Sequence, residues 1–233
     1  MVRPRRETHV DLAADIKRIA FRRLAELGTQ GLSLRAIARE LNITAPAIYN
    51  YFPRLEDLIT ALIVDAFTAL GDALVAGRDA VAASDLVQRL RATGLAYRRW
   101  AIEHPEQYNL IFGTPIPGYE APIAITQPAA ARGLDILVAA LDDAHRAGQL
   151  QLDADLLAAT PGLLEEIDAW RQADGNAADP RIHYLALAVW TRVHGFVSLE
   201  LGRQFPAALQ DTGAIFRLEL ERILAECGLK GSA

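Results

Sequence analysis

A single stretch, Ser33–Arg54, constrains the fold of this chain more than any other segment. Apolar residues recur in it at helical spacing in two short runs, which predicts two short helices with one buried face each. Between the runs lies Leu41–Thr44, where Asn42 tolerates a left-handed turn conformation. Thr44 is a candidate N-cap for the second helix, and Pro46 suits the first turn that follows. The stretch therefore predicts two helices joined by a tight turn.

Such a pair can be a helix-turn-helix, whose second helix usually enters the major groove of DNA, or an ordinary helical hairpin. Charge favours the first interpretation. Residues 1–54 carry ten Lys and Arg but five Asp and Glu, whereas the rest of the chain carries 14 basic and 24 acidic residues. A basic segment on an acidic body indicates a nucleic-acid footprint confined to one end of the chain. Arg3, Arg5 and Arg6 could add an arm that touches DNA, or form a flexible terminus without a role.

Composition and periodicity predict an all-α protein. The chain is 52% hydrophobic, rich in Ala and Leu, and shows no strand alternation. The basic start lacks an apolar segment behind it, and no uncharged apolar run of about 18 residues follows, so we expect neither a signal peptide nor a membrane span. The single cysteine, Cys227, excludes an intrachain disulfide and is expected to be a buried, inert thiol. These features favour a cytoplasmic location.

Helical periodicity divides the chain into modules. Three helices are expected before residue 53, the first over about 9–28 with Gly28 at its end. A fourth helix, about 55–75, is followed by a weak break at 76–84. Later helices are predicted at about 85–104, 106–113, 123–148 with Pro128 as a possible new start, 153–173 interrupted at Pro161–Gly162, 181–202 and 206–228. The expected domains are a helix-turn-helix DNA-binding domain (1–54), a connecting helix (55–77) and a helical ligand-binding and dimerisation domain (78–233).

The segment from about Ile16 to Leu62 resembles the DNA-binding part of the TetR family of transcriptional regulators. The family usually carries a phosphate-binding lysine at the position of Leu55, and Arg54 is the candidate replacement. The matching residues are Ala20, Leu24, Gly28, Ser33, Ile37, Ala38, the run Thr44–Phe52, Glu56, Leu58 and Ile59. Downstream, the motif Trp190-Thr191-Arg192-Val193-His194-Gly195 and the stretch His104–Phe112 are similar to one C-terminal subgroup of that family, which has a Trp-x-x-x-His-Gly signature.

The resemblance and the residue chemistry together predict a DNA-contacting surface. Thr44 and Asn50 can hydrogen-bond base edges, and Ala45 or Ala47 can touch a thymine methyl group. By resemblance Tyr49 binds phosphate, although either Tyr49 or Tyr51 could instead pack in the core. Arg35, near a helix start, is expected to meet the DNA backbone. The predicted DNA-binding residues are Arg35, Thr44, Ala45, Pro46, Ala47, Tyr49, Asn50, Tyr51 and Arg54.

Two stripes near the end of the chain predict helix pairing. The first consists of small residues from Ala188 to Gly202, and the second runs from Leu209 to Cys227, both with spacings of three and four. Such seams favour packing at small crossing angles, either between subunits, as the resemblance implies, or inside an intrachain core. The predicted dimer-interface residues are Thr191, Gly195, Ser198, Gly202, Leu209, Phe216, Leu220 and Ile223.

Candidate ligand residues are harder to read from sequence. Aromatic side chains can line a small-molecule site, but each is also an ordinary core residue, and a structural role for His194 is favoured over ligand contact. The candidates are Tyr97, Trp100, Tyr108, Phe112, Trp170 and His194. Trp190 is expected to pack rather than to contact a ligand.

The resemblance implies a dimeric regulator, which we expect to be a repressor. Such a repressor leaves a palindromic operator in double-stranded DNA when an unidentified small-molecule effector binds. An all-α enzyme is the first alternative. No nucleophile with a paired base, phosphate loop or metal-ligand spacing is visible, so we expect no catalytic residue, cofactor or metal. Two further alternatives stay open. The chain could be a DNA-binding module that responds to a protein partner or to no signal, and it could activate transcription instead of repressing it.

Overall fold

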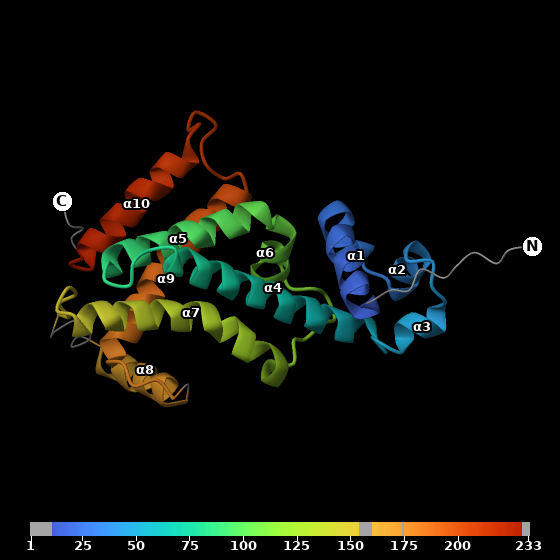
Figure 1. Cartoon of the computed structure of the whole chain (residues 1–233), viewed down its shortest axis with the longest axis horizontal. Coiled ribbons are helices and arrows are strands. Elements are labelled where there is room, and N and C mark those ends of the chain that lie inside the picture. The colour runs from blue at the N-terminus through green and yellow to red at the C-terminus, as the bar shows by residue number, and fades with distance from the viewer. Residues whose placement is uncertain (1–10, 154–159, 174, 230–233) are drawn as a thin grey trace, which may run out of the picture. The chain divides into compact units, whose positions relative to one another are not determined.

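The computed structural model describes residues 11–153, 160–173 and 175–229, and every regular element within these ranges is helical (Figure 1). The predicted all-α fold is confirmed. The suggested arm of Arg3, Arg5 and Arg6 lies outside the described residues. The elements are α1 Leu12–Leu27, a 3₁₀ turn η1 Thr29–Gly31, α2 Leu34–Glu40, α3 Ala45–Tyr49, α4 Leu55–Asp79, α5 Leu86–Glu103, α6 Pro105–Phe112, α7 Ile123–Arg146, α8 Pro161–Ala173, α9 Pro180–Leu201 and α10 Thr212–Glu226.

The helices divide into two compact units. The N-terminal unit comprises Met1–Ala66 with His104–Pro128, and the C-terminal unit comprises Phe67–Glu103 with Ala129–Ala233. Helices α4 and α7 each begin in the first unit and end in the second. Helix α4 therefore connects the helix-turn-helix to the larger helical unit along the chain.

A small apolar core holds the N-terminal unit together. Helix α1 contacts α2 and α6, and α2 contacts α3. Ile16 on α1, Ile37 on α2 and Ile48 on α3 are each 0% exposed. Each buried isoleucine contributes about 1.5–3 kcal/mol relative to an exposed one. These three positions follow the helical spacing of apolar residues in the sequence, whereas Leu27, the last residue of α1, is exposed.

The turn between α2 and α3 forms as the sequence predicts. Asn42 has φ +54°, which places it in the left-handed region. The Asn42 N–H donates to the Arg39 carbonyl at 3.1 Å, and the Ile43 N–H donates to the Ala38 carbonyl at 3.0 Å. This pair of bonds is the Schellman arrangement, which satisfies carbonyls left open at a helix end. It ends α2 abruptly and sets the direction in which α3 begins.

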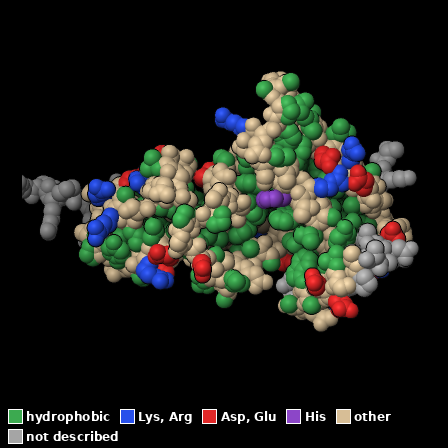
Figure 2. Space-filling model, turned by 180° about the vertical axis from the view of Figure 1, so that it is seen from behind, with side chains coloured by type: hydrophobic (Ala, Val, Ile, Leu, Met, Phe, Trp, Pro, Cys, Tyr) green, Lys and Arg blue, Asp and Glu red, His purple; other side chains and the backbone are tan. Residues whose placement is uncertain are grey.

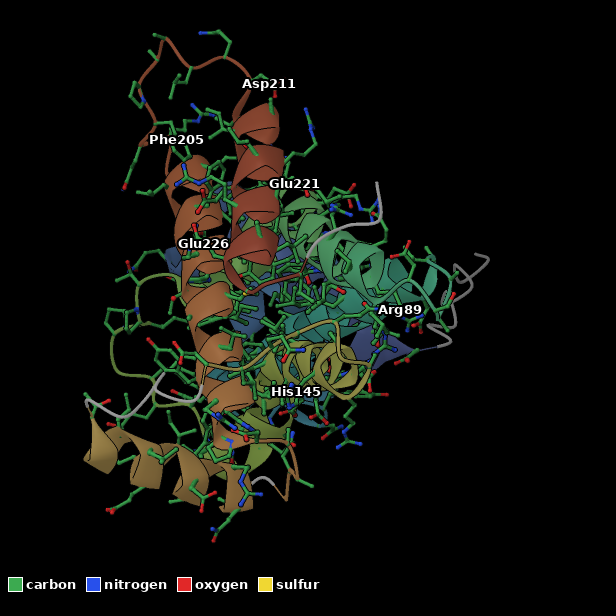
Figure 3. All side chains as sticks on the ribbon, turned by 90° about the vertical axis from the view of Figure 1, so that its left-hand side faces the viewer. Arg89, His145, Phe205, Asp211, Glu221 and Glu226 are labelled. Atoms are coloured by element: carbon green, nitrogen blue, oxygen red, sulfur yellow. The ribbon has the colours of Figure 1, made fainter. Side chains whose placement is uncertain are left out.

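In the C-terminal unit, α5 packs against α9 and α10, α9 and α10 pack together, and α8 contacts α9. A charged network joins three of these helices. The Arg98 guanidinium donates to Glu200 at 2.6 and 2.8 Å, and both side chains are largely covered. Glu221 and Glu226 of α10, labelled in Figure 3, accept from Arg91 (2.7 Å to Glu221) on α5 and from Arg192 on α9.

Two features of the helices differ from the sequence prediction. Helix α4 continues to Asp79 rather than ending near residue 75. Pro128 does not start a new helix but lies inside α7, where its missing N–H removes the hydrogen bond to the carbonyl of residue 124. Helix α8 begins at Pro161, since proline is accommodated at the first helical position, and residues 154–159, which the predicted helix would include before its interruption, lie outside the described residues.

The last helix also starts later than predicted. Helix α10 begins at Thr212, and the expected first turn from about residue 206 is loop. The reason is local: Asp211 occupies the N-cap position, and its carboxylate accepts from the Ala214 N–H at 2.7 Å. Leu209 therefore lies on a loop and not on the helical stripe assigned to it.

Two of the described helices, α4 and α7, are long and apolar enough to cross a membrane when only length and composition are considered. The most apolar part of α4 is half buried inside the protein, where Leu58, Leu62 and Ala66 are fully covered. A core helix of a soluble protein passes the same test, so the two helices are weak evidence for a membrane protein.

Replacing Asn42 by valine should lower the free energy of unfolding by about 1–2 kcal/mol, because a β-branched residue is strained at φ +54°. Replacing Asn42 by glycine should leave stability equal or higher. Urea unfolding of both variants followed by circular dichroism measures the difference. Equal stability of the two variants would contradict the importance of this turn.

Candidate DNA-binding surface and ligand cavity

The second helix of the helix-turn-helix, α3, has one buried anchor and an open outer surface. Ile48 points into the core, and Phe52, just after the helix, is 8% exposed. By contrast, Tyr49 and Tyr51 are 38% and 49% exposed. The other predicted contact residues on this surface are exposed, apart from the half-buried Ala47: they are Thr44, Ala45, Pro46 and Asn50.

Two hydroxyl groups at helix starts have no capping bond. Ser33 and Thr44 stand at the N-cap positions of α2 and α3 with extended backbone, as the sequence predicted for Thr44, but neither side chain accepts a capping hydrogen bond. Both residues are exposed. A hydroxyl beside a helix N-terminus is well placed to meet a phosphate oxygen or a base edge.

Basic side chains of the N-terminal unit fall into paired and unpaired groups. Lys17 pairs with Asp65 at 2.6 Å, and both Arg22 and Arg23 pair with Glu40. Arg35 and Arg39 on α2 are exposed and make no ion pair within the described part of the chain. Figure 2 shows the basic side chains of this unit in blue at the surface. The unpaired positive charge on α2 is therefore available to DNA phosphate.

Arg54, unlike Arg35, is paired with a carboxylate of its own chain. Its guanidinium donates to both Asp57 carboxylate oxygens, at 2.9 and 3.4 Å, and its backbone N–H donates to Asp57 at 2.9 Å. The hydrogen bond from Arg54 lowers the pKa of the Asp57 carboxyl below its ordinary value. Asp57 also sits in the first turn of α4, where a carboxylate favours the helix dipole. A phosphate that binds Arg54 must therefore compete with Asp57.

The C-terminal unit contains a partly open apolar cavity of about 60 Å³. Its wall combines side chains of α4, α5, α7, α9 and α10 with Leu229 beyond the last helix. None of the described lining residues is charged. The wall consists of Leu74, Leu90, Thr93, Gly94, Tyr97, Gly133, Leu137, Leu141, Val189, Trp190, Val193, Leu220, Ile223, Leu224, Cys227 and Leu229.

One polar pair borders this cavity. The Tyr97 hydroxyl lies 2.8 Å from His194 Nδ1, and His194 Nε2 lies 3.4 Å from the Ser198 hydroxyl. The Trp190 ring stacks on the imidazole with 4.9 Å between ring centroids. Burial lowers the pKa of His194 below its ordinary value, so the ring is neutral at pH 7. His194 thus orients Tyr97 at the cavity wall.

The structure does not bring all six predicted ligand residues together. Tyr97 lines the cavity and His194 is bonded to it, whereas Trp100 is buried elsewhere in α5. Tyr108 and Phe112 belong to α6 in the N-terminal unit, where their ring centroids lie 5.1 Å apart.

Trp170 on α8 packs edge-on against His183, with 5.2 Å between ring centroids. Neither Trp170 nor Trp100 belongs to the described wall of the cavity. Of the aromatic candidates, Tyr97 alone contributes to that wall, together with Trp190, which the sequence had suggested only as a packing residue.

The residues that sequence reasoning missed are aliphatic ones. Leucines such as Leu137 and Leu141 line the cavity, but their helical spacing is the spacing of any core residue. The sequence also gave no indication that Gly94 and Gly133 line a cavity. No sequence pattern in a single chain separates a core leucine from a cavity leucine.

The predicted dimer residues on α9 differ in exposure from those on α10. On α9, Thr191 and Gly202 are exposed and Gly195 and Ser198 half-buried, and a Cβ added at Gly195 would meet nothing within 4 Å. On α10, Phe216, Leu220 and Ile223 are buried inside the single chain, which is the intrachain alternative for that stripe. Leu209, on the loop, is 45% exposed.

Two family profiles match the chain. Residues 18–62 match the profile of "Bacterial regulatory proteins, tetR family", and residues 90–223 match "Tetracyclin repressor-like, C-terminal domain". The first match covers the helix-turn-helix and the second covers both downstream motifs. Neither description names a subgroup, so the assignment from the Trp-x-x-x-His-Gly motif stays a prediction.

Relatives that align over nearly the whole chain are also transcriptional regulators. The chain is 32% identical over 222 residues to the HTH-type transcriptional regulator Rv1816 of Mycobacterium tuberculosis, covering 95% of this chain and 94% of the relative. Among solved structures, the regulatory protein SCO4313 is 34% identical, with TM-score 0.75 over 96% of this chain and 100% of that one. A Rhodococcus protein of unknown function shares the fold at 21% identity, with TM-score 0.75 over 97% and 100% of the two chains. The chain belongs to the TetR family of DNA-binding transcriptional regulators, which are not enzymes.

Proposed function

We propose that this regulator is a cytoplasmic homodimer that represses transcription from a palindromic operator and leaves the DNA when a small molecule binds its C-terminal unit. The observation that carries the ligand response is the apolar cavity, which lies in the unit that does not contain the helix-turn-helix. Small-molecule sites are typically such apolar hollows with few polar groups. The unpaired Arg35 and the open surface of α3 support the DNA contact.

In this proposal α3 lies in the major groove. Thr44 and Asn50 address base edges, Ala45 and Ala47 meet thymine methyl groups, and Pro46 sets the start of the helix. Tyr49, Tyr51 and Arg35 hold phosphates and fix the register without reading sequence. Arg54 contributes less than Arg35, since Asp57 already neutralises it.

The dimer would use the open faces of α9 and α10. On α9 the line Leu187, Thr191 and Gly195 is partly or fully uncovered, and on α10 Leu218 is 63% exposed. Phe216, Leu220 and Ile223, buried in the subunit, would act by holding α10 in place. A two-fold dimer presents two copies of α3, which is what a palindromic operator requires.

Ligand response would be a shift between two populations of the dimer. A molecule in the cavity favours whichever arrangement of the five wall helices accommodates it, and it acts only through that difference in affinity. Helix α4 is the natural connection, because Leu74 lines the cavity while Leu55 follows the helix-turn-helix. The ligand-bound arrangement would space the two α3 helices wrongly for adjacent major grooves.

Arg35→Ala should weaken DNA binding about tenfold at low salt, as expected for one charge-assisted phosphate bond of about 1.5 kcal/mol. It should weaken all DNA sequences alike and reduce the slope of log K against log salt by about 0.9. Fluorescence anisotropy over a salt series measures both. Arg54→Ala is the matched control and should have the smaller effect; a loss with Arg35→Ala confined to one operator sequence contradicts its phosphate role.

Gly195→Leu should convert the dimer to monomers without unfolding the subunit, because the space beyond Gly195 is empty in the single chain. Sedimentation velocity measures the change, and circular dichroism checks the fold. Gly162→Leu on α8 is the control, since a Cβ there also meets nothing within 4 Å. An unchanged sedimentation profile for Gly195→Leu would count against the proposed interface.

A gel shift with promoter DNA next to the protein's own gene tests the regulatory role. The expected result is a salt-sensitive complex that dissociates when a compound fitting the cavity is added. A complex that persists with every such compound, together with a melting temperature that none of them changes, points instead to a regulator without a small-molecule effector.

A further inference from the structure

We propose that the N-terminal unit has a small-molecule site of its own, which takes an organic ammonium ion carrying an apolar group about the size of one ring. The site is a cleft where the end of α1 packs against α6, and both helices belong to this unit. It is distinct from the cavity of the C-terminal unit. The wall of this α1–α6 cleft consists of Leu24, Ala25, Gly28, Thr29, Pro105, Glu106, Asn109 and Leu110.

The α1–α6 cleft has room for a ring-sized molecule as it stands. It measures about 250 Å³, whereas an apolar cavity of about 150 Å³ already admits benzene. Glycine takes φ +65° without strain, so α1 stops at Gly28 with no side chain to fill the adjoining space. The cleft is partly open to solvent, and a ligand can therefore enter without separating the helices.

Part of the wall is apolar. Leu24 is 7% exposed and Leu110 is half-buried, so both already belong to the edge of the core. Pro105 and Ala25 extend this surface toward solvent. A ring laid on these side chains removes apolar area from water, which favours binding by about 25 cal/mol for each Å² covered.

The electrostatics of the cleft select a cation. Glu106 is the one charged residue of the described wall, and it is half-buried. Ala25, Gly28 and Thr29 bring the carbonyl end of α1 to the same space, and the last turn of this helix contains no basic residue. Cations are stabilised at the C-terminal end of a helix dipole. A ligand anion would meet both the carboxylate and the carbonyl end unfavourably.

Neighbouring arginines are already committed elsewhere. Arg22 and Arg23, on the turn of α1 before the cleft, both pair with Glu40. Arg23 also donates to the Gly31 carbonyl at 2.8 Å. Within the described part of the chain Glu106 makes no ion pair, so its carboxylate is available to a ligand.

The polar side chains of the wall match the donors of an ammonium group. Such a group has three N–H donors and no acceptor. The Glu106 carboxylate, the Thr29 hydroxyl and the Asn109 side-chain carbonyl are acceptors that line the cleft. None of the three side chains is hydrogen-bonded to another described residue. A primary amine attached to a ring therefore fits this wall better than an alcohol or an acid of the same shape.

The experiment titrates the full-length protein at neutral pH and constant ionic strength with 2-phenylethylammonium, 2-phenylethanol and 3-phenylpropanoate. Backbone amide shifts of Gly28, Thr29 and Asn109, measured by NMR, report occupancy of the cleft itself. The ammonium ion should bind about fivefold more tightly than the alcohol, as expected for one partly covered ion pair. The propanoate should bind more weakly than the alcohol.

Two variants with matched controls locate the ligand. Glu106→Gln should lower the affinity for 2-phenylethylammonium about fivefold and leave that for 2-phenylethanol unchanged. Glu26→Gln is its control, because it removes the same charge from an exposed position of α1 outside the wall. Ala25→Leu should weaken both probes, since the larger side chain takes space from the cleft at an exposed helical position. Ala14→Leu, also exposed on α1, is the matched control.

The outcomes test this site independently of the proposed ligand response, because neither DNA binding nor the C-terminal cavity enters the readout. Shifts of the three amides that appear with the ammonium ion and weaken in Glu106→Gln support the site. Equal affinities for the three probes overturn the ligand class, as does an undiminished ammonium affinity in Glu106→Gln. The site is also overturned when millimolar ammonium leaves the three amides unshifted.

Discussion

The DNA-reading surface depends on one buried side chain. Helix α3 has five residues, too few to be stable in isolation, so its position must come from tertiary contacts. Ile48 supplies the anchor inside the core with Ile37 and Ile16, and the left-handed Asn42 fixes the angle of entry. The exposed groups of α3 are therefore held in place by its packing against the other helices of the N-terminal unit. Loss of that anchor would displace α3 without changing any of the residues proposed to contact DNA.

Sequence alone predicted this part of the molecule well because its signals are local. Helical spacing, the asparagine in the turn and Pro46 each act within a few residues, and all of them appear in the structure as expected. The start of α10 was predicted wrongly for an equally local reason. Asp211 is a better N-cap than the residues near Pro206, but the apolar periodicity continued upstream of it and suggested an earlier start.

The C-terminal unit was less predictable because its cavity depends on long-range packing. Leu74, Tyr97, Gly133 and Trp190 come from four helices far apart in the sequence. Their periodicity only places them on inward faces. Whether those faces close completely or leave a hollow depends on distances between helices, such as the close approach at Gly94, where an added Cβ would lie 2.7 Å from Leu220. A single sequence does not contain that information.

The hollow also has a consequence for the lifetime of the protein. By the usual cost of about 24 cal/mol for each Å³ of cavity, the empty space removes somewhat more than 1 kcal/mol of stability. A molecule that fills it restores the missing contacts and stabilises the native state by mass action. Because cellular proteases act on the unfolded population, a molecule that fills the cavity would also slow turnover of the regulator. The amount of the regulator in the cell would then rise with the concentration of that molecule.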